Sequence, residues 1–362
     1  MAANGPKCTA VDCDDANKSL KDPINVAVTG AAGQVAYSLL YMIGRGEAFG
    51  KDQSINLNLF DVNSMMRSLE GVAMELEDCA LPLVNNILLA PDVETCFKDA
   101  AAIFLIGSSV RIEGMNRKSL FQASVPIFKE QAEAINQVAL KDVKVLVLAN
   151  PCNTNAYVCS HYATCIPKEN FSALSRLDHN RTKVQIARRL GIPAQDVQNV
   201  VIWGGRSGTQ FPDIRHATVS YNGVLQSAVS ALADEKFLQN TIVTSIQKRN
   251  PAILAARKLA SAMSQAKAAC DQMHDWWNGT RRGEFVSMSV LSDGSYGIPK
   301  DIFYSFPVQI RNKKWRIVKG LPIDEFAREK LDASARELVE EKEEALALCE
   351  EVDVDQGGTL TS

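Results

Sequence analysis

The stretch INVAVTGAAGQVAYSLL, residues 24–40, decides the fold of this chain. Its first six residues, Ile24–Thr29, are mostly apolar and β-branched, which is typical of a buried strand. Gly30 and Gly33 follow, and the apolar spacing beyond them predicts a helix through Ile43. Glycines at such a turn let a ligand approach the backbone, and a helix N-terminus offers N–H groups to an anion. The stretch therefore predicts a strand–turn–helix unit that either binds a phosphate group or is a tight turn without a ligand.

Three more apolar segments in the first half of the chain are predicted to be buried strands: Ile55–Phe60, Ala101–Ile106 and Val143–Ala149. Between the first two, Met65–Cys79 has apolar residues at helical spacing. Because apolar strands alternate with helices, the pattern predicts a parallel sheet covered by helices on both faces.

An acid, Asp61, stands at the end of the second predicted strand. Such an acid accepts hydrogen bonds from the ribose of a bound dinucleotide, and its charge repels a 2′-phosphate. The separation of Gly30 from Asp61 exceeds the usual ~20 residues, and a loop at residues 44–54 accounts for the excess. Together with the glycine turn, Asp61 predicts binding of NAD rather than NADP.

The second half of the chain starts near Phe171 and is predicted to hold longer helices, at Asn180–Leu190 and at Pro251–Trp277, which has no Gly or Pro after Pro251. A charged amphipathic helix is predicted at Ile323–Glu351. The predicted strands are Val197–Trp203, Thr218–Leu225, Glu284–Ser289, Ser305–Ile310 and Lys314–Val318, the last three antiparallel.

Polar residues follow two of the predicted strands, where ligands bind in sheets of this kind. Arg111 and Arg117 flank Gly114, so that a loop would bring both guanidinium groups to a carboxylate; otherwise they are solvated loop arginines. Asn150 follows another strand end, where its amide would donate and accept near a carbonyl, or simply cap a turn.

Two later segments also carry reactive side chains. Asp178 and His179 stand together in the word LDHNR, at a predicted helix start, where Asp178 is either an N-cap or a functional acid. Arg206 lies in the Gly-rich loop Trp203–Thr209, which taken alone is a turn with one solvated arginine.

Composition limits the possible functions. The chain has 362 residues, with 39 basic and 42 acidic ones and a net charge of −3, which argues against a broad nucleic-acid surface. The longest nearly uninterrupted apolar run, Ala100–Gly107, is far shorter than the roughly 20 residues of a membrane span. Nine scattered cysteines indicate free thiols in a reducing compartment, no metal site is predicted, and only four histidines are present.

The domain organisation follows from these segments. Residues 24–172 are predicted to be an NAD-binding domain and residues 173–350 a substrate domain. Residues 1–23 have neither the apolar core of a secretory signal nor the Arg-rich pattern of a transit peptide, so they are expected to be a flexible extension or a docking tail. Residues 351–362 are expected to form a flexible tail, and the expected location is the cytoplasm.

The chain resembles the NAD-dependent malate dehydrogenases of the cytosolic type, in the lactate/malate dehydrogenase superfamily, over roughly Ile24–Leu348. The resemblance implies a doubly wound parallel Rossmann sheet followed by a mixed α/β substrate domain, a homodimer, and hydride exchange between malate and NAD. The segments that carry it are VTGAAGQVAYSLL (28–40), MELEDCALPL (74–83), EGMNRK (113–118), NPCNTN (150–155), PKENFSALSRLDHNR (167–181) and FYSFP (303–307).

The resemblance also implies roles for individual residues. Asp178 would orient the general base, Asp61 would bind the ribose, Gln131 would lie near the cofactor, and Asn150 would contact both substrate and nicotinamide. The pyrophosphate would lie at Gly30, Ala31, Ala32, Gly33 and Gln34, and the dicarboxylate would be held by Arg111, Arg117, Arg181 and Ser261.

The general base departs from the family pattern. The family sequence motif is WGNHSSTQYPD, and residues 203–213 of this chain read WGGRSGTQFPD. Arg206 therefore stands at the histidine position, Gly205 replaces the Asn before it, and Gly208 replaces a Ser. Asn250-Pro251 also departs from the usual Gly-Ala. Arginine has no acceptor site and stays charged at neutral pH, so it cannot take the hydroxyl proton. Losing a positioned base typically costs about 10²–10⁴-fold in rate.

Two functions remain open at this point. The chain is either a dehydrogenase with severely reduced malate turnover or one retuned to another 2-oxo acid, or it is a catalytically inactive protein that binds NAD and a dicarboxylate in a sensing or scaffolding role. The retained arginines indicate a kept ligand pocket, and Arg206 beside them would favour a more highly charged anion. Such an anion site would need Asp178 as a counter-ion, and the alternative is a structural Asp178–Arg206 ion pair. His179 and His216 are expected to lie away from the chemistry.

Overall fold

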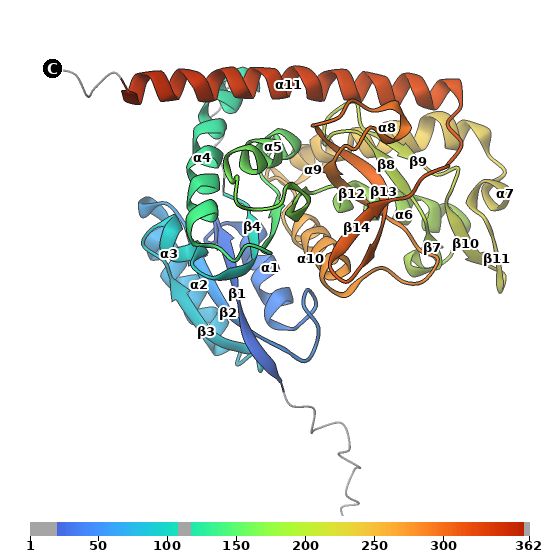
Figure 1. Ribbon diagram of the computed structural model, residues 1–362. Helices are drawn as coiled ribbons and strands as arrows, with labels where there is room; N and C mark the ends of the chain where they lie inside the picture. The colour runs from blue at the N-terminus through green and yellow to red at the C-terminus, as the bar shows by residue number, and fades with distance from the viewer. Residues whose placement is uncertain (1–19, 108–116, 358–362) are drawn as a thin grey trace, which may run out of the picture.

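The computed structural model describes residues 20–107 and 117–357. Its centre is a nine-stranded sheet in the order β14-β13-β12-β6-β5-β4-β1-β2-β3 (Figure 1). The order β3-β2-β1-β4-β5-β6 is that of the doubly wound dinucleotide-binding fold, so the predicted fold class is confirmed. These six strands are parallel: β1 (Lys21–Thr29), β2 (Gln53–Phe60), β3 (Val84–Leu89), β4 (Ala100–Leu105), β5 (Lys144–Val147) and β6 (Phe171–Ala173).

Helices cover both faces of the parallel sheet, as its apolar strands predict. Val26 and Val28 of β1 belong to a core cluster that includes α1 and α10, whereas Ala27 between them packs into a second cluster with α4 and α5. The helices are α1 (Gln34–Gly44), α2 (Met66–Asp78), α3 (Val93–Phe97), α4 (Arg117–Val138), α5 (Cys152–Tyr162), α6 (Arg176–Leu190), α7 (Ala228–Leu232), α8 (Ile242–Gln247), α9 (Arg249–Arg257), α10 (Met263–Asn278) and α11 (Glu325–Gly357).

The second half of the chain extends the same sheet. β12 (Val286–Leu291) pairs antiparallel with β6, and β13 (Phe303–Arg311) and β14 (Lys314–Ile317) continue outward as antiparallel strands, which confirms the three predicted there. The predicted domain boundary at residues 172/173 falls inside β6. One continuous sheet therefore carries both halves of the molecule.

Two predicted strands of the second half are each broken by a residue with positive φ. The segment Thr218–Leu225 is a hairpin of β10 (Thr218–Tyr221) and β11 (Val224–Ser227), because Asn222 and Gly223, at φ 52° and 76°, form its turn. The segment Val197–Trp203 divides into two strands at Asn199, with φ 60°. The divided strands are β7 (Val197–Gln198) and β8 (Val201–Trp203), which pairs with β9 (Phe211–Asp213).

The helix limits also differ from the prediction. The single helix predicted at Pro251–Trp277 is wrong, because Lys258 has φ 60° and ends α9 before α10 begins. The final helix α11 continues to Gly357, past the predicted boundary at residue 350, and β1 already begins at Lys21 within the predicted extension. Residues 1–19 lie outside the described part.

The helix α11 runs along one side of the molecule and packs on α4 and α5 (Figure 1). It thereby joins the last segment of the chain to the first domain. None of the helices in the described ranges is long and apolar enough to cross a bilayer. The seven cysteines of these ranges are all free, as predicted.

Candidate active site

The turn after β1 is shaped for close approach to the backbone. Gly30 has φ +65°, and a Cβ there would lie 2.7 Å from both N and Cα of Gly107, so only glycine fits. The N–H of Gly33 donates to the Gly30 carbonyl oxygen at 3.0 Å, and α1 begins at Gln34 with no side-chain cap from the described residues. The first N–H groups of α1 therefore suit a phosphate.

Asp61 follows β2 and is held against this turn. Its Oδ2 accepts a hydrogen bond from the N–H of Ala32 at 2.9 Å, and its Oδ1 accepts from the N–H of Val62 at 2.8 Å. One carboxylate thus joins the glycine turn to the end of the neighbouring strand, which is where an acid meets the ribose in this fold. The structure brings Asp61 and the glycine turn together, and the ribose contact itself stays a prediction.

A cavity of about 300 Å³ lies beside the end of β5. Asn150, between β5 and α5, lines it together with Arg206, and α11 closes it with Glu337 and Glu341. Arg111 lies outside the described residues, and Arg117 begins α4 but its side chain is likewise outside the described part. Their contacts with a substrate stay predictions.

Asp178 and Arg181 form a buried ion pair on α6. Asp178 is 1% exposed, and its Oδ1 accepts from Nη1 of Arg181 at 2.9 Å. Nη2 of Arg181 donates to Oδ1 of Asn250 at 2.6 Å, and Ser261 Oγ lies 3.5 Å from the same oxygen. The structure therefore brings three predicted residues, Asp178, Arg181 and Ser261, to one place.

The alternative of an Asp178–Arg206 ion pair is not found among the described residues. Within residues 20–107 and 117–357, the ion pair of Asp178 is with Arg181, which lies three positions along the same helix and so faces it directly. Asp178 and Arg206 nevertheless line the same narrow cavity between α6 and the loop after β8. The two residues are neighbours without being partners.

Arg206 is half-buried and incompletely paired. Its backbone N–H donates to Asn153 Oδ1 at 3.1 Å, and its Nη1 donates to the Leu148 carbonyl oxygen at 3.5 Å. Nε and Nη2 are buried and meet no acceptor in the part of the chain that the structure describes. Burying a guanidinium N–H without an acceptor is costly, so this position suits an anionic ligand.

The loop that carries Arg206 is tied to α11. Glu337 accepts hydrogen bonds from Ser207 Oγ, at 2.6 Å, and from Thr209 Oγ1, and Ser334 Oγ accepts from the N–H of Gly205 at 3.0 Å. Sequence reasoning missed Glu337, because it lies about 130 positions from its partners and is one of many acids on a charged helix. No local signal in the sequence distinguishes it from its neighbours.

Two family models together cover most of the chain. Residues 24–172 match the lactate/malate dehydrogenase NAD binding domain, and residues 175–349 match the lactate/malate dehydrogenase α/β C-terminal domain. The chain belongs to the lactate/malate dehydrogenase family. Its first domain is the family's NAD-binding domain, and NAD is its cofactor.

Relatives with high identity agree with this assignment. The chain is 55% identical to human cytoplasmic malate dehydrogenase over 327 residues, covering 90% of this chain and 98% of the human protein. It is 41% identical to a crystal structure of malate dehydrogenase from Naegleria fowleri, with a TM-score of 0.86, covering 91% of this chain and all of that one. Trichomonas vaginalis lactate dehydrogenase in complex with NADH and oxamate has a TM-score of 0.86 and 36% identity, covering 91% and 99%.

None of the four histidines of this family member lines the cavity that holds Arg206. His179 is buried, its Nδ1 lies 3.0 Å from Ser287 Oγ, and burial lowers its pKa well below the usual value. His216 is 3.8 Å from Asp213 with its pKa also lowered by burial, His161 stacks on Tyr157, and His274 contacts the Glu47 carbonyl oxygen. Each of the four histidines therefore has its contacts away from the lining of that cavity.

Gln131 is the least settled of the predicted cofactor residues. It is buried on α4, and its Oε1 has no hydrogen-bond partner among the described residues. Nothing in these contacts places it at the glycine turn, so its role stays a prediction. Within the described ranges, no group of His, Cys, Asp and Glu side chains could hold a metal ion.

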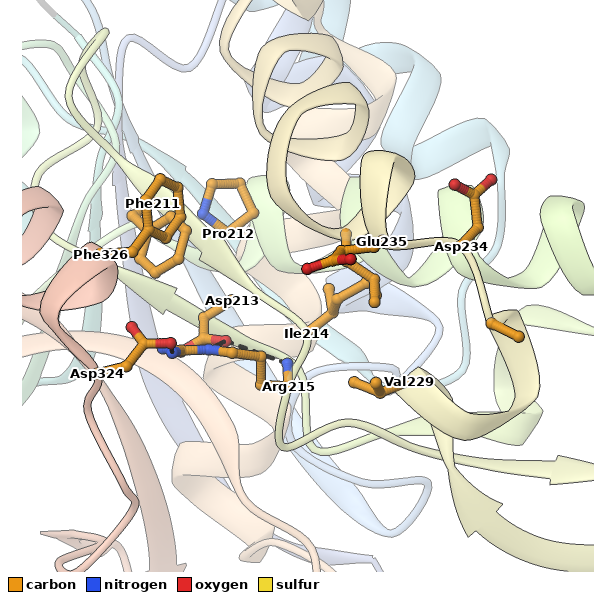
Figure 2. A pocket seen from close by; sticks show the side chains of 12 residues that line it. Phe211, Pro212, Asp213, Ile214, Arg215, Val229, Asp234, Glu235, Asp324 and Phe326 are labelled. Carbon is orange, nitrogen blue, oxygen red and sulfur yellow. Dashed lines mark hydrogen bonds and ion pairs between the residues drawn. The ribbon is translucent and has the colours of Figure 1, made fainter.

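A larger cavity, of about 510 Å³, lies apart from these residues, beside β9 and the start of α11 (Figure 2). Arg215 crosses it and binds Asp213 at 2.7 Å and Asp324 at 2.5 Å, while Phe211 and Phe326 pack edge to face on one side. It contains none of the predicted site residues. Arg215 is paired there with Asp213 and Asp324, and Asp234 is paired with Arg189 outside the lining.

Proposed function

We propose that this family member binds NAD and a dicarboxylate such as malate or oxaloacetate, and that it turns malate over at a severely reduced rate. The observation that carries the proposal is Arg206, a half-buried cation at the position where the family pattern has its histidine base, whose Nε and Nη2 meet no acceptor among residues 20–107 and 117–357. The same feature supports anion binding and opposes proton transfer.

The residues present fit the cofactor. Gly30 lets the turn pack directly against the backbone of Gly107, and the helix that follows Gly33 has no side-chain cap among the described residues, so the first N–H groups of α1 are left for a pyrophosphate. When bound, NAD would accept the hydride that leaves the carbon bearing the hydroxyl group. The protein must then bind the dicarboxylate, hold its hydroxyl and remove the hydroxyl proton.

Proton removal is the step that this site does poorly. A base must accept the hydroxyl proton as the hydride leaves, and the guanidinium of Arg206 has no free lone pair for it. Water is a weaker base than a positioned imidazole, so the step is slow in both directions. Arg206 still stabilises negative charge on the substrate oxygen, because its unpaired N–H groups need an acceptor.

The charge around Arg181 favours an anion. Arg206 and Arg249 lie near enough to Arg181 that their charges act with burial to lower its pKa, against the opposing effect of Asp178. The charges of Arg181, Arg206 and Arg249 are thus opposed by the buried carboxylate of Asp178. A ligand with two carboxylates would offset the excess positive charge and give acceptors to the unpaired N–H groups.

Binding of hydroxymalonate, a stable 2-hydroxy dicarboxylate, to the complex with NADH tests this proposal by calorimetry. We expect saturable binding that Arg206→Gln weakens about tenfold or more, because a hydrogen bond from a charged group is lost. Arg188→Gln, an exposed arginine at the end of α6, is the control and should leave the affinity unchanged. Unchanged binding in Arg206→Gln would contradict the role of Arg206 as an anion contact.

The alternative function is a binding protein without catalysis. The observation in its favour is that no histidine lines the cavity with Arg206. Tight binding of NADH and hydroxymalonate without any consumption of NADH by oxaloacetate would favour this alternative.

The cytoplasmic names of the malate dehydrogenase relatives support the cytoplasm as the proposed location.

We also propose a homodimer. Tyr37 and Tyr41 on α1 are 50% and 44% exposed, Met74 on α2 is 62% exposed, and the hydroxyl of Tyr37 donates to Glu75 of α2. These two helices therefore present neighbouring apolar side chains to solvent, which is unusual for a monomer and common at interfaces.

Sedimentation equilibrium tests the dimer. The native chain should have twice its own mass of 39.5 kDa, and Tyr41→Asp combined with Met74→Asp should reduce the mass to that of one chain, because buried charge disfavours the interface. Leu225→Asp, at a side chain that is 70% exposed on β11, should leave the mass unchanged. A native chain that sediments as a monomer would refute the proposal.

A further inference from the structure

Arg181 is held from two sides. Its Nη1 donates to Asp178 on its own helix, and its Nη2 donates to Asn250 on α9 at 2.6 Å. A guanidinium binds a carboxylate through a pair of parallel N–H groups, so each N–H that is already engaged weakens that contact. Asn250 therefore competes with any carboxylate that binds Arg181 through Nη2.

The atom that faces Arg181 must be the amide oxygen of Asn250. A guanidinium only donates hydrogen bonds, so the amide nitrogen would oppose it donor to donor. The same oxygen lies 3.5 Å from Ser261 Oγ, the other predicted substrate residue in the described part. One acceptor thus reaches both groups, as a carboxylate oxygen of the substrate is expected to do.

The segment around Asn250 belongs to the same site as Arg206. Gln247, at the end of α8, donates to the Gln210 carbonyl oxygen at 2.8 Å, so this segment is fixed to the loop that follows Arg206. The charges of Arg206 and Arg249 both act on Arg181. Asn250 is thus positioned at the anion site rather than on a remote surface.

The Asn250 contact is displaceable. Asn250 itself is exposed, and none of the residues of α9 is buried, so few packing contacts hold this helix in place. A carboxylate has a full negative charge where the amide oxygen has a partial one, so it forms the stronger bond to Arg181. Substrate binding can therefore replace the amide, at the cost of the hydrogen bond that it breaks.

We propose that Asn250 is a specificity-determining residue whose amide oxygen occupies the place of a substrate carboxylate on Arg181 and Ser261. The inference rests on the proposed function, since it assigns the competitor at that dicarboxylate site. Because the amide must first be displaced from Arg181, a ligand that binds the site weakly is excluded. A ligand with a higher negative charge displaces the amide and binds. Asn250 stands where the family pattern has the smallest residue, which offers no such acceptor.

Two substitutions at this position should act in opposite directions on the affinity for hydroxymalonate in the presence of NADH. Asn250→Gly removes the competitor, so binding should tighten about tenfold, the size expected for a hydrogen bond to a charged group. Asn250→Asp places a carboxylate on Arg181 permanently, so binding should weaken at least about tenfold. Leu254→Ala, one turn along α9 at a side chain that is 48% exposed, is the control and should change neither value.

Calorimetry with hydroxymalonate separates the outcomes, and the affinity for NADH, measured on each variant, verifies that the first domain is intact. If the native chain binds hydroxymalonate and Asn250→Gly binds it equally or more weakly, the inference is overturned and the proposed function stands. If neither chain binds hydroxymalonate while both bind NADH, the dicarboxylate site itself is wrong and the inference falls with it.

Discussion

Arg206→His is expected to raise the rate of malate oxidation by about 10²–10⁴-fold, the usual contribution of a positioned general base. Histidine accepts the hydroxyl proton through a free ring nitrogen, which arginine lacks. Asp178 lines the same narrow cavity as residue 206, and we expect its carboxylate to accept the other ring N–H and orient the imidazole. The measurement is NADH oxidation by oxaloacetate and NAD reduction by malate, in the native chain and in the variant.

The backbone at residue 206 should remain in place in this variant. Its N–H bond to Asn153 and the contacts of the loop with α11 do not involve the arginine side chain. A substitution at Gly205 is less easily accommodated, because a Cβ there would lie 2.9 Å from Leu338 Cδ2. Restoring the family's Asn at position 205 would therefore require the Leu338 side chain to move. The single substitution is therefore the cleaner test.

Arg206→Gln is the matched control, since it removes the charge without adding a base, and it should stay as slow as the native chain or slower. A native rate equal to that of Arg206→His would refute the proposal that proton removal limits turnover. The rate must change in both directions together, because a catalyst leaves the equilibrium unaltered.

The pH profile gives a second readout of the same substitution. In Arg206→His, malate oxidation should increase as the pH rises through the pKa of the new imidazole, near its usual value of about 6.5, because only the neutral ring accepts a proton. The native chain should show no inflection from this source. His179 does not supply one, since burial holds its pKa well below the usual value and Ser287 fixes its ring away from the cavity.

The sequence predicts those parts of the fold and site that depend on near neighbours. The strand, glycine turn and helix at residues 24–43 follow from apolar periodicity and from the conformation that only Gly30 can adopt. Asp61 is predicted from its place at a strand end, and the structure shows it bonded to that turn. The hairpin at Asn222-Gly223 had an equally local signal, which the uninterrupted strand prediction overlooked.

The remaining features depend on contacts between distant segments. The sequence leaves an Asp178–Arg206 ion pair open, but Asp178 pairs with Arg181, which is one turn away on the same helix and is reached at lower entropic cost. The position of Arg206, whose Nε and Nη2 meet no acceptor in the described ranges, and the bond of Ser207 to Glu337 arise only when β8, α5 and α11 meet. A sequence pattern shows that such residues are polar and does not show which partners they find.

Gly30→Ala is expected to destabilise the protein by about 2–5 kcal/mol and to remove NAD binding. A non-glycine residue at positive φ costs about 1–2 kcal/mol, and forcing an extra methyl group into a packed contact costs about 1–3 kcal/mol more. The contact here is with backbone atoms, since the new Cβ would lie 2.7 Å from N and Cα of Gly107, whose N–H donates to the Thr29 carbonyl oxygen at 3.2 Å.

Relief of this clash requires the glycine turn to move away from β4. That movement shifts the N–H groups at the start of α1 and breaks the Ala32–Asp61 bond, so the pyrophosphate and ribose contacts are lost together. Chemical denaturation and NADH fluorescence titration measure the two effects.

Gly71→Ala provides the matched control, because Gly71 lies on α2 with no atom within 4 Å of the added Cβ. There alanine favours the helix, so stability should be unchanged or higher by up to about 1 kcal/mol, with native NADH affinity. The same chemical change should therefore have opposite signs at two positions of one domain. Native NADH affinity in Gly30→Ala would show that this turn is not where the pyrophosphate binds, even if the fold assignment is right.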